Sequence, residues 1–479
     1  MNADKATALP LTALDALPLP NRESTRAPLA AALAQLGRKI VVLDDDPTGI
    51  QTVHGVSVYT AWDAQTMREA FAEPCPLFFV LTNSRALTAR QTEALHREIA
   101  LNIVSAAQAT GKDYLVVSRG DSTLRGHYPL ETETLRDTLE AAGGKRYAGE
   151  IILPYFMQGG RFTLDNIHYV REGERLTPVG QTEFAQDRTF GFLASHLGAW
   201  CEEKTGGRYR AADMVYLSLA DLRAAALSRL TAQLLSAQDL QKIIVNAACD
   251  ADVEVFVLAL CAAMQAGHEY LFRSAAALPK ALGGIADKPL LSAAELLSSH
   301  SENGGMVVVG SHVGKTTRQL DALMHSDLPL DLIEFDQHLV LKAGGLAGET
   351  ARAAAAADAA MRRGRTAVVY TRRDRLDLPG ADPEGQLRVS VEISAAVTDV
   401  VARLTARPRF IIAKGGITSS DVGVKALGVK RATVLGQIAP GVPVWQTGPE
   451  SKFPLIPYVI FPGNVGEDAT LRTVVERFW

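Results

Sequence analysis

The sequence of 479 residues has few cysteines and no marked excess of charge of either sign. Its four cysteines, Cys75, Cys201, Cys249 and Cys261, are scattered without C-x-x-C spacing, which argues against a zinc site or a disulfide framework. We expect them to be reduced, buried thiols. The formal net charge of -4 argues against a nucleic acid as the main partner, so an anionic ligand should be a small molecule.

Long apolar runs are also missing. The most apolar stretch, VEVFVLALCAAMQAG from Val253, is too short to cross a bilayer and contains Glu254. The first residues, MNADKATALPLTALDALPLP, lack the basic segment and continuous apolar core of an export signal, and their prolines would break a helix. We therefore expect a cytoplasmic protein without membrane attachment.

Two common nucleotide-binding signatures are missing or incomplete. No G-x-G-x-x-G follows an expected strand, which argues against a nicotinamide-dependent oxidoreductase. The segment VVVGSHVGKTTRQL, Val307–Leu320, resembles a P-loop, but only three residues separate Gly310 from Gly314, where the Walker pattern needs four. The segment is either an ordinary strand-to-helix turn or a different kind of phosphate-binding turn, since a helix N-terminus attracts anions.

What the sequence does contain is a series of short β-branched runs, each followed by a polar turn and a stretch of helical period. This pattern is typical of βαβ units with parallel sheets. The runs are KIVVLDDD, LFFVLTNS, YLVVSRGD, EIILPYF, MVYLSL and KIIVNAA in the first half, and MVVVGSH, DLIEFD, AVVYTRRD, FIIAKGG, VPVWQTG and YVIFPGN in the second. We predict two α/β domains, each a largely parallel sheet flanked by helices.

The predicted boundary lies near residue 300, inside the glycine- and serine-rich stretch Gly283–Gly305, which gives domains 1–300 and 301–479. The stretch from about Arg188 to Asp213 looks like an excursion from the repeating pattern, and its role is open.

Polar residues collect directly after three runs of the first half. Ligands bind outside the carboxyl ends of strands in open parallel sheets, so these turns are candidate sites. They contain Asp44 to Gly49, Thr82 to Arg85, and Ser118 to Gly126. Three adjacent aspartates repel one another unless a cation or proton offsets them, and the guanidinium groups of Arg85 and Arg119 suit a carboxylate or phosphate. The residues indicate a small hydroxylated acid as ligand.

The second half places glycine and hydroxyl residues in the same positions. The turns GSHVGKTT, KGGITSSD and FPGNVGED offer backbone N–H groups rather than charged side chains. Glycine lets a phosphate approach the backbone closely, so three such turns at one sheet edge favour a nucleotide. Two domains with these ligands indicate a small-molecule kinase with its active site in the cleft between them. A nicotinamide oxidoreductase and a non-catalytic sugar-acid sensor are the alternatives from other classes.

Taken together, the motifs resemble those of the four-carbon acid sugar kinase family over nearly the whole chain. DDPTG from Asp45, DSTLRG from Asp121, GGRFT from Gly159 and QTEFAQD from Gln181 resemble segments of the family's N-terminal domain. In the second half, Gly310, Ser311, Thr316 and Gln319 follow a GSxSxxTxxQ pattern, GGITS resembles GGETS, and GNVG from Gly463 resembles GNxG. Family members phosphorylate acids such as D-threonate, D-erythronate and 3-oxo-tetronate with ATP.

The resemblance implies roles for individual residues. Those implied to hold the sugar acid are Asp45 or Asp46, Arg85, Arg119, Gly120, Asp121 and Ser122. Those implied to hold ATP are Ser311, Gly415, Gly416, Ile417, Thr418 and Gly463. Mg²⁺ is expected to bridge the ATP phosphates, while Asp45, Asp46 or Asp121 orients or deprotonates the terminal hydroxyl of the acid. The protein ligands of Mg²⁺ are open, because kinases often hold this ion through phosphates and water.

Some positions depart from the family pattern. Val313 stands where serine is common, and Ile417 where an acidic residue is common, which affects the expected nucleotide or metal contacts. Asp44, Pro47 and the nearby His54 make the first motif unusual, so a branched acid such as 3-oxo-isoapionate is an alternative substrate. The sequence leaves open the substrate's stereochemistry, the identity of the base and the oligomeric state, for which a homodimer is one option.

Overall fold

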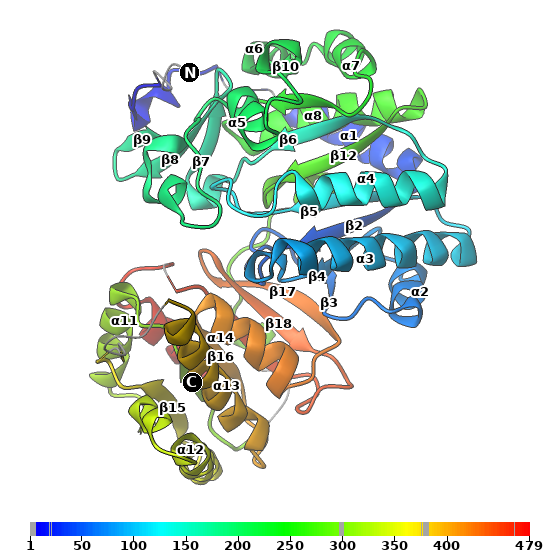
Figure 1. The fold of residues 1–479 in the computed structure, drawn as a ribbon. Coiled ribbons are helices and arrows are strands. Elements are labelled where there is room, and N and C mark those ends of the chain that lie inside the picture. The colour runs from blue at the N-terminus through cyan, green and yellow to red at the C-terminus, as the bar shows by residue number, and fades with distance from the viewer. Residues whose placement is uncertain are drawn as a thin grey trace. The chain divides into compact units, whose positions relative to one another are not determined.

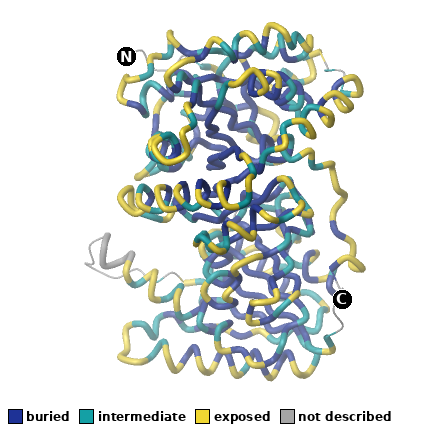
Figure 2. The backbone as a smooth tube through the Cα atoms, turned by 90° about the vertical axis from the view of Figure 1, so that its right-hand side faces the viewer, coloured by how far each residue is buried: buried dark blue, intermediate teal, exposed yellow. Residues whose placement is uncertain are grey.

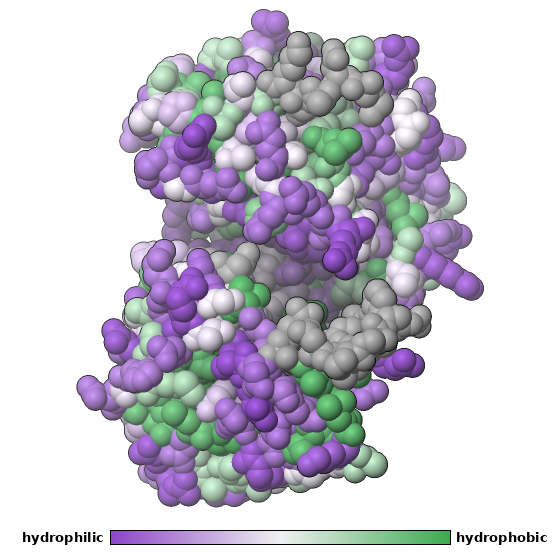
Figure 3. Space-filling model, turned by 60° about the vertical axis from the view of Figure 1, so that its left-hand side comes forward, coloured by the Kyte–Doolittle hydropathy of each residue, from purple (hydrophilic) through white to green (hydrophobic). Residues whose placement is uncertain are grey.

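The computed structural model describes residues 6–18, 20, 22–296, 301–374, 376, 383–463 and 465–479. The chain forms two compact units, the first with residues 1–52 and 61–287, the second with residues 53–60 and 288–479. The boundary predicted near residue 300 falls at residues 297–300, outside the described part of the chain. No helix in the described ranges is long and apolar enough to span a bilayer. On the face drawn in Figure 3, hydrophilic residues surround small clusters of hydrophobic residues.

The first unit is built around a parallel sheet. Its strands, in spatial order, are β10 (Val215–Leu217), β11 (Gln241–Val245), β6 (Tyr147–Leu153), β12 (Glu269–Ser274), β5 (Tyr114–Arg119), β2 (Lys39–Asp44) and β4 (Leu77–Leu81). One face is covered by α3 (Ala89–Thr110) and α4 (Leu130–Gly143), and the other by α1 (Arg22–Leu36), α7 (Leu227–Leu235) and α8 (Asp250–Gln265) (Figure 1). The apolar strands are therefore buried on both sides, as in other parallel sheets.

A small antiparallel sheet extends this unit. It consists of β1 (Leu9–Pro10), β9 (Arg175–Pro178), β8 (Ile167–Glu172) and β7 (Arg161–Leu164), paired in that order. The excursion from Arg188 to Asp213 contains α5 (Leu197–Lys204), whose Trp200 stacks on Tyr128 with 4.5 Å between ring centroids. The excursion thus supplies core residues to the first unit.

The second unit has a mixed sheet. Five of its strands are parallel, in the order β19 (Pro457–Phe461), β16 (Ile411–Lys414), β13 (Met306–Val309), β15 (Thr366–Thr371) and β14 (Leu330–Phe335). The antiparallel strands β18 (Val442–Thr447), β17 (Arg431–Ala439) and β3 (Ser57–Tyr59) continue it beyond β19. One face carries α12 (Gly345–Arg362), α13 (Pro383–Arg403) and α14 (Gly416–Asp421), and the other carries α11 (Gly314–Met324) and α15 (Thr470–Glu476).

The predicted two-domain α/β class is confirmed, and each of the predicted β-runs contributes a strand. Figure 2 shows the buried backbone in the sheets and the exposed backbone on the outer sides of the helices. The remaining helices are short and connect these layers: α2 (Ala64–Ala72), α6 (Leu219–Arg223), α9 (Ala277–Leu282) and α10 (Ala293–Leu296).

Candidate functional site

Three turns of the first unit meet at one edge of its parallel sheet. The strands β5, β2 and β4 are hydrogen-bonded neighbours in that order and run in the same direction. The turns after them therefore lie together at the carboxyl edge, where open parallel sheets bind ligands. These turns hold all the predicted catalytic and substrate-binding residues: Asp45, Asp46, Arg85, Arg119, Gly120, Asp121 and Ser122.

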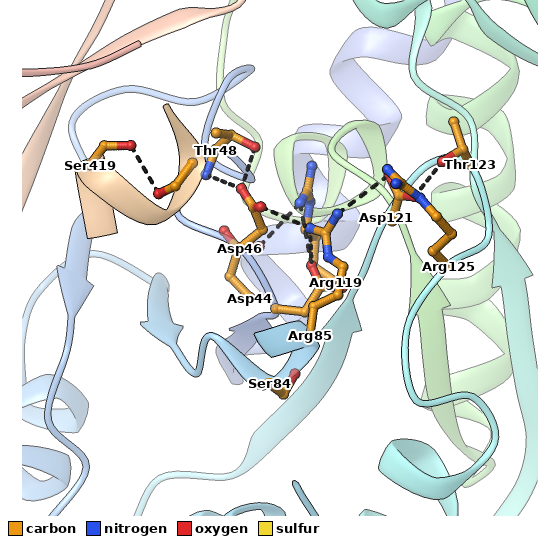
Figure 4. A network of polar contacts seen from close by, with 12 residues as sticks. Asp44, Asp46, Thr48, Ser84, Arg85, Arg119, Asp121, Thr123, Arg125 and Ser419 are labelled. Atoms are coloured by element: carbon orange, nitrogen blue, oxygen red, sulfur yellow. Dashed lines mark hydrogen bonds and ion pairs between the residues drawn. The ribbon is translucent and has the colours of Figure 1, made fainter. Parts of the chain in front are cut away.

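Arg85 lies at the centre of this group. It follows β4 in a short 3₁₀ turn, Ser84–Ala86. Its Nη2 is 3.0 Å from Asp45 Oδ1 and 3.2 Å from Asp46 Oδ2, and its Nη1 is 3.8 Å from Asp121 Oδ1. Figure 4 shows the guanidinium between the Asp46 and Asp121 side chains. One arginine thus joins the turn after β2 to the turn after β5.

Arg119, the last residue of β5, is also paired with the chain's own carboxylates. Its Nη1 is 3.2 Å from Asp44 Oδ1 and 3.9 Å from Asp45 Oδ1, and 5% of its side chain is exposed. Both arginines that the sequence predicted as substrate ligands therefore already have internal partners. A substrate carboxylate would have to compete with these buried ion pairs to bind either of them.

The aspartates after β2 differ in their affinity for protons. Burial raises the pKa of Asp44 to about 7, and it also raises the pKa of Asp45. Asp45 Oδ2 is buried and has no hydrogen-bond partner among the described residues. Burial opposes ionisation of Asp46 too, but Arg85 and two hydrogen bonds from Thr48 lower its pKa. Asp45 is therefore the carboxylate that is suited to accept a proton, whereas Asp46 stays ionised.

Asp121 is held as an anion by its own turn. The Thr123 hydroxyl donates to its Oδ2, and Arg125 Nε donates to the same atom at 2.7 Å. Burial alone would raise the pKa of Asp121, but Arg85 and Arg125 hold it below the usual range. Asp121 can therefore orient a hydroxyl or balance a cation, but it is a weak base.

The other two predicted residues of this turn position its backbone. A Cβ at Gly120 would lie 1.2 Å from Arg273 Nη1, so a larger residue here would displace this buried guanidinium. The Ser122 carbonyl accepts a hydrogen bond of 2.8 Å from His168 Nε2. Burial lowers the pKa of His168 to about 4, which keeps the ring neutral near pH 7 and fixes its hydrogen bonds.

Sequence reasoning assigned no site role to three further arginines. Arg125 and Arg161 occur inside the quoted motifs DSTLRG and GGRFT, so a signal was present for both. Arg273 lies within β12 and is buried, and no local pattern marks it as part of the site. Its Nη2 donates to the Arg125 carbonyl at 2.8 Å.

The second unit brings its three glycine-rich turns together around one cavity. They follow the neighbouring parallel strands β19, β16 and β13. The cavity has a volume of about 850 Å³. All six residues predicted to hold the nucleotide line it: Ser311, Gly415, Gly416, Ile417, Thr418 and Gly463. The sequence therefore located the parts of one concave site, although Ser311 and Gly463 are 152 residues apart.

The turns around this cavity are packed tightly against one another. A Cβ at Gly310 would lie 2.6 Å from Thr418 Oγ1, and Gly415 has φ +124, a conformation that L side chains rarely adopt. Thr316 Oγ1 donates to the Gly463 carbonyl at 3.0 Å. These contacts leave backbone atoms at the cavity surface and fix the three turns in one arrangement.

Apolar side chains form another part of the cavity wall. One face of α13 contributes Val391 and Val397, and the turn after β16 contributes Ile417, which is 68% exposed. Exposed apolar groups beside glycine and hydroxyl turns suit a ligand that has a flat apolar part and a polar part, which is typical of small-molecule sites.

The lysine of the P-loop-like segment is not the best-placed cation here. The cavity lining includes Arg373 but not Lys315. Arg373 Nη2 donates to the Ser311 carbonyl at 2.7 Å and to Thr317 Oγ1 at 2.9 Å, while its Nε and Nη1 are buried without a hydrogen-bond partner. Burial lowers its pKa, but an arginine remains charged near neutral pH. In the sequence, Arg373 stands out only as part of the β-run AVVYTRRD.

The Lys414 side chain is buried and hydrogen-bonded to the backbone of the turn after β19. Its Nζ donates to the Pro462 carbonyl at 2.6 Å and lies 4.0 Å from the Phe461 ring centroid. Burial, and to a smaller degree the nearby charge of Lys315, lower its pKa to about 7. Within the described ranges, no group of three or more His, Cys, Asp or Glu side chains is arranged to hold a metal ion.

Two protein-family models match this chain, one in each half of the sequence. A model for a sugar-binding N-terminal domain matches residues 40–282, and a model for a nucleotide-binding C-terminal domain matches residues 306–471. A search of curated proteins gives no match.

Two solved structures are similar in fold. The Haemophilus influenzae protein HI1011 is 16% identical, with a TM-score of 0.60 over 92% of this chain and 100% of that chain. A Salmonella typhimurium protein whose name suggests a tRNA synthase is 16% identical, with a TM-score of 0.65 and the same coverage. The sugar-binding model spans about half of the chain and the nucleotide-binding model most of the remainder, so the chain belongs to the four-carbon acid sugar kinase family.

Proposed function

We propose that the protein is an ATP-dependent kinase that phosphorylates the terminal hydroxyl of a small sugar acid. Residues 1–300 form the sugar-acid domain in this proposal, and residues 301–479 form the nucleotide domain. The main support is that six separately predicted turn residues line a single cavity in the nucleotide-binding unit. The cluster of carboxylates and guanidinium groups in the sugar-binding unit would bind the sugar acid and accept the proton of its hydroxyl.

In the nucleotide cavity, the ATP phosphates would lie against the turns that begin at Ser311 and Gly415. Backbone N–H groups of such turns bind phosphate oxygens, and glycine permits the close approach. The unpaired Nε and Nη1 of Arg373 would add a charge-assisted contact. The adenine ring would pack against the apolar wall formed by Val391, Val397 and Ile417.

In the sugar-acid site, Asp45 would act as the general base. Its Oδ2 has no hydrogen-bond donor, and its raised pKa favours uptake of a proton from the acceptor hydroxyl. The anionic Asp46 and Asp121 would orient the hydroxyl groups of the substrate, and Arg85 would hold the three carboxylates in register. Bound Mg²⁺ would enter with ATP and neutralise phosphate charge during transfer.

The expected substrates are D-threonate, D-erythronate and 3-oxo-tetronate, with the branched acid 3-oxo-isoapionate as the alternative. The test is incubation with ATP, Mg²⁺ and each acid, followed by mass spectrometry. A product heavier by one phosphate, formed with ADP, supports the proposal. Acid-dependent reduction of a nicotinamide, or acid binding without any ATP consumption across the panel, would contradict it. A cytoplasmic location and a homodimer remain predictions.

A further inference from the structure

Two arginines beside the sugar-acid site, Arg161 and Arg273, form no ion pair with a carboxylate among the described residues. Arg273 is only 4% exposed and donates to the Arg125 carbonyl, whereas Arg161 is half-buried. Arg85, Arg119 and Arg125 all form ion pairs with aspartates of the surrounding turns. Arg161 forms no ion pair with any carboxylate in the described part of the chain, and its Nε is buried without a hydrogen-bond partner. Burial lowers its pKa, but a guanidinium keeps its charge at neutral pH. Arg161 is therefore a partly buried cation without an ion-pair partner among the described residues, which is costly to retain without an anion.

The local structure holds this side chain in a defined position. Arg161 begins β7, and its backbone is bridged to Phe156 by hydrogen bonds in both directions. A Cβ at Gly159 would lie 2.4 Å from the Phe156 ring and 3.4 Å from Arg161 Nη1. The motif GGRFT thus provides glycine where the ring and the guanidinium need the space.

Contacts connect Arg161 to the aspartate cluster. The guanidinium carbons of Arg161 and Arg125 lie 5.6 Å and 5.0 Å from the centroid of the same ring, that of Phe184. Arg125 in turn binds Asp121 at 2.7 Å, and the charges of Asp121 and Arg125 both act on Arg161. Arg161 is therefore part of the same electrostatic environment as the turn after β5.

This arrangement gives the site two different ends. Next to Arg85, at one end, Asp45 and Asp46 present acceptor oxygens, and one of these, Asp45 Oδ2, has no donor. At the other end, beyond Asp121 and Arg125, Arg161 presents a guanidinium that has no ion-pair partner among the described residues. A sugar acid has the complementary polarity, with a carboxylate at C1 and a hydroxyl at the far end of its chain.

We propose that Arg161 binds the carboxylate of the sugar acid and thereby directs the terminal hydroxyl toward Asp45. This role deepens the proposed kinase function and rests on it for the identity of the ligand. Arg161 selects acids over neutral polyols, because a polyol of the same length leaves the guanidinium unpaired. Arg85 and Arg119 support the site through their internal ion pairs.

Calorimetric binding tests this role without requiring turnover. The probes are D-threonate and D-erythronate, each compared with its neutral polyol, threitol or erythritol. We expect Arg161→Met to weaken acid binding by about 30-fold or more while polyol binding changes little, so that the preference for the acid collapses. Arg161→Lys should restore part of the preference, since the charge remains but the planar fork is lost. Arg175→Met, which removes an exposed arginine of strand β9 in the same antiparallel sheet, should match the wild type.

The outcomes separate this proposal from the kinase assignment. A wild-type protein that binds the acids but phosphorylates none of them would contradict the kinase function, while loss of acid preference in Arg161→Met would still support this site. Unchanged acid preference in a folded Arg161→Met protein would overturn the role of Arg161, even if the kinase is active. A wild type that shows no preference for acids over polyols would overturn it as well.

Discussion

Asp45 and Asp46 are consecutive in sequence but differ in their hydrogen bonding. Thr48 donates two hydrogen bonds to Asp46 Oδ1, whereas Asp45 Oδ2 receives none from the described residues. We expect Asp45→Asn to lower kcat by about 100-fold or more, because the amide cannot accept the proton. The rise of kcat with pH that reports this base should disappear too. Steady-state kinetics across pH measure both effects.

The exposed Asp137 offers a matched control for this substitution. Its side chain is 66% exposed and pairs only with a surface arginine among the described residues. Asp137→Asn should leave kcat and its pH profile unchanged. A folded Asp45→Asn enzyme with wild-type kcat would transfer the role of base to another carboxylate.

We expect Arg373 to contribute strongly to nucleotide binding and Lys315 to contribute little. Arg373 lines the cavity with two unpaired nitrogen atoms, whereas Lys315 is not part of the lining. We expect Arg373→Met to weaken ADP and ATP binding about tenfold or more, equivalent to ~1.4 kcal/mol. Lys315→Ala should cost at most about tenfold in kcat/KM. Calorimetry and steady-state kinetics measure these effects.

The neighbouring Arg372 serves as the control, because it pairs with Asp374 and Asp336. Arg372→Met should bind ADP like the wild type. If Lys315→Ala were folded but inactive while Arg373→Met bound nucleotide normally, the segment would act as a true P-loop despite its shorter spacing.

At the scale of elements, the turn after β16 depends on one glycine. Gly415 has φ +124, and its N–H donates to the Phe461 carbonyl of β19 at 2.8 Å. A Cβ there would lie 3.2 Å from Thr418 Oγ1 and 3.3 Å from Ser311 Cβ. We expect Gly415→Ala to weaken ADP binding at least about tenfold and to destabilise the fold by about 1–2 kcal/mol.

Gly428 provides a control for the backbone strain alone. It also has a positive φ, +62, but a Cβ there would have no heavy atom within 4 Å. Gly428→Ala should lower the thermal midpoint slightly and leave ADP affinity intact. Equal ADP affinity in both variants would show that the turn after β16 does not contact the nucleotide.

The sequence predicted the buried parallel strands well, because continuous β-branched runs followed by polar turns mark them clearly. It did not predict β12, whose buried Arg273 interrupts an apolar run, or β17, where buried residues alternate with partly buried ones. The period of two in β17 is a usable signal for a half-buried strand. The pattern of β12 carried no equivalent signal.

The sequence predicted the site residues that directly follow apolar strands, but not those whose role depends on contacts in the folded protein. Parallel strands place their following turns at one edge, so Asp45, Arg85 and Asp121 could be grouped from strand order alone. The significance of Arg161 depends on what is missing around it, namely a carboxylate partner. Pairing of charges is a tertiary property, and the sequence predicted Arg119 as a substrate ligand without showing that Asp44 occupies it.

For the whole molecule, buried groups with shifted pKa values make the stability of the fold depend on pH. The pKa of Asp44 is raised from 3.8 to about 7 in the folded protein, so the folded state binds more protons between these values. Its stabilising contribution is complete below pH 4 and is lost as the pH rises through 7. The raised pKa of Asp45 acts with the same sign. His168 acts against both, because its pKa falls from 6.5 to about 4 on folding, so the unfolded state binds more protons between these values and stability rises with pH there.

Lys414 has the opposite effect to Asp44 in a different pH window. Its pKa falls from 10.5 to about 7 on folding, so the unfolded state binds more protons between pH 7 and 10.5, and stability rises with pH there. We expect urea midpoints to rise from pH 7 to 9, whereas between pH 5 and 7 the contributions of Asp44 and His168 have opposite signs. Asp44→Asn should make the slope between pH 5 and 7 more positive than in the wild type, and Lys414→Met should flatten the rise between pH 7 and 9. Each of these contributions to the free energy of unfolding is at most a few kcal/mol, since one pKa unit corresponds to about 1.4 kcal/mol.

The variants are compared by the slope of the urea midpoint against pH. Both substitutions also remove hydrogen bonds and therefore shift the midpoint at every pH. An Asp44→Asn protein with the wild-type slope between pH 5 and 7 would show that Asp44 is ionised throughout this range, and its pairing with Arg119 would then dominate over its burial.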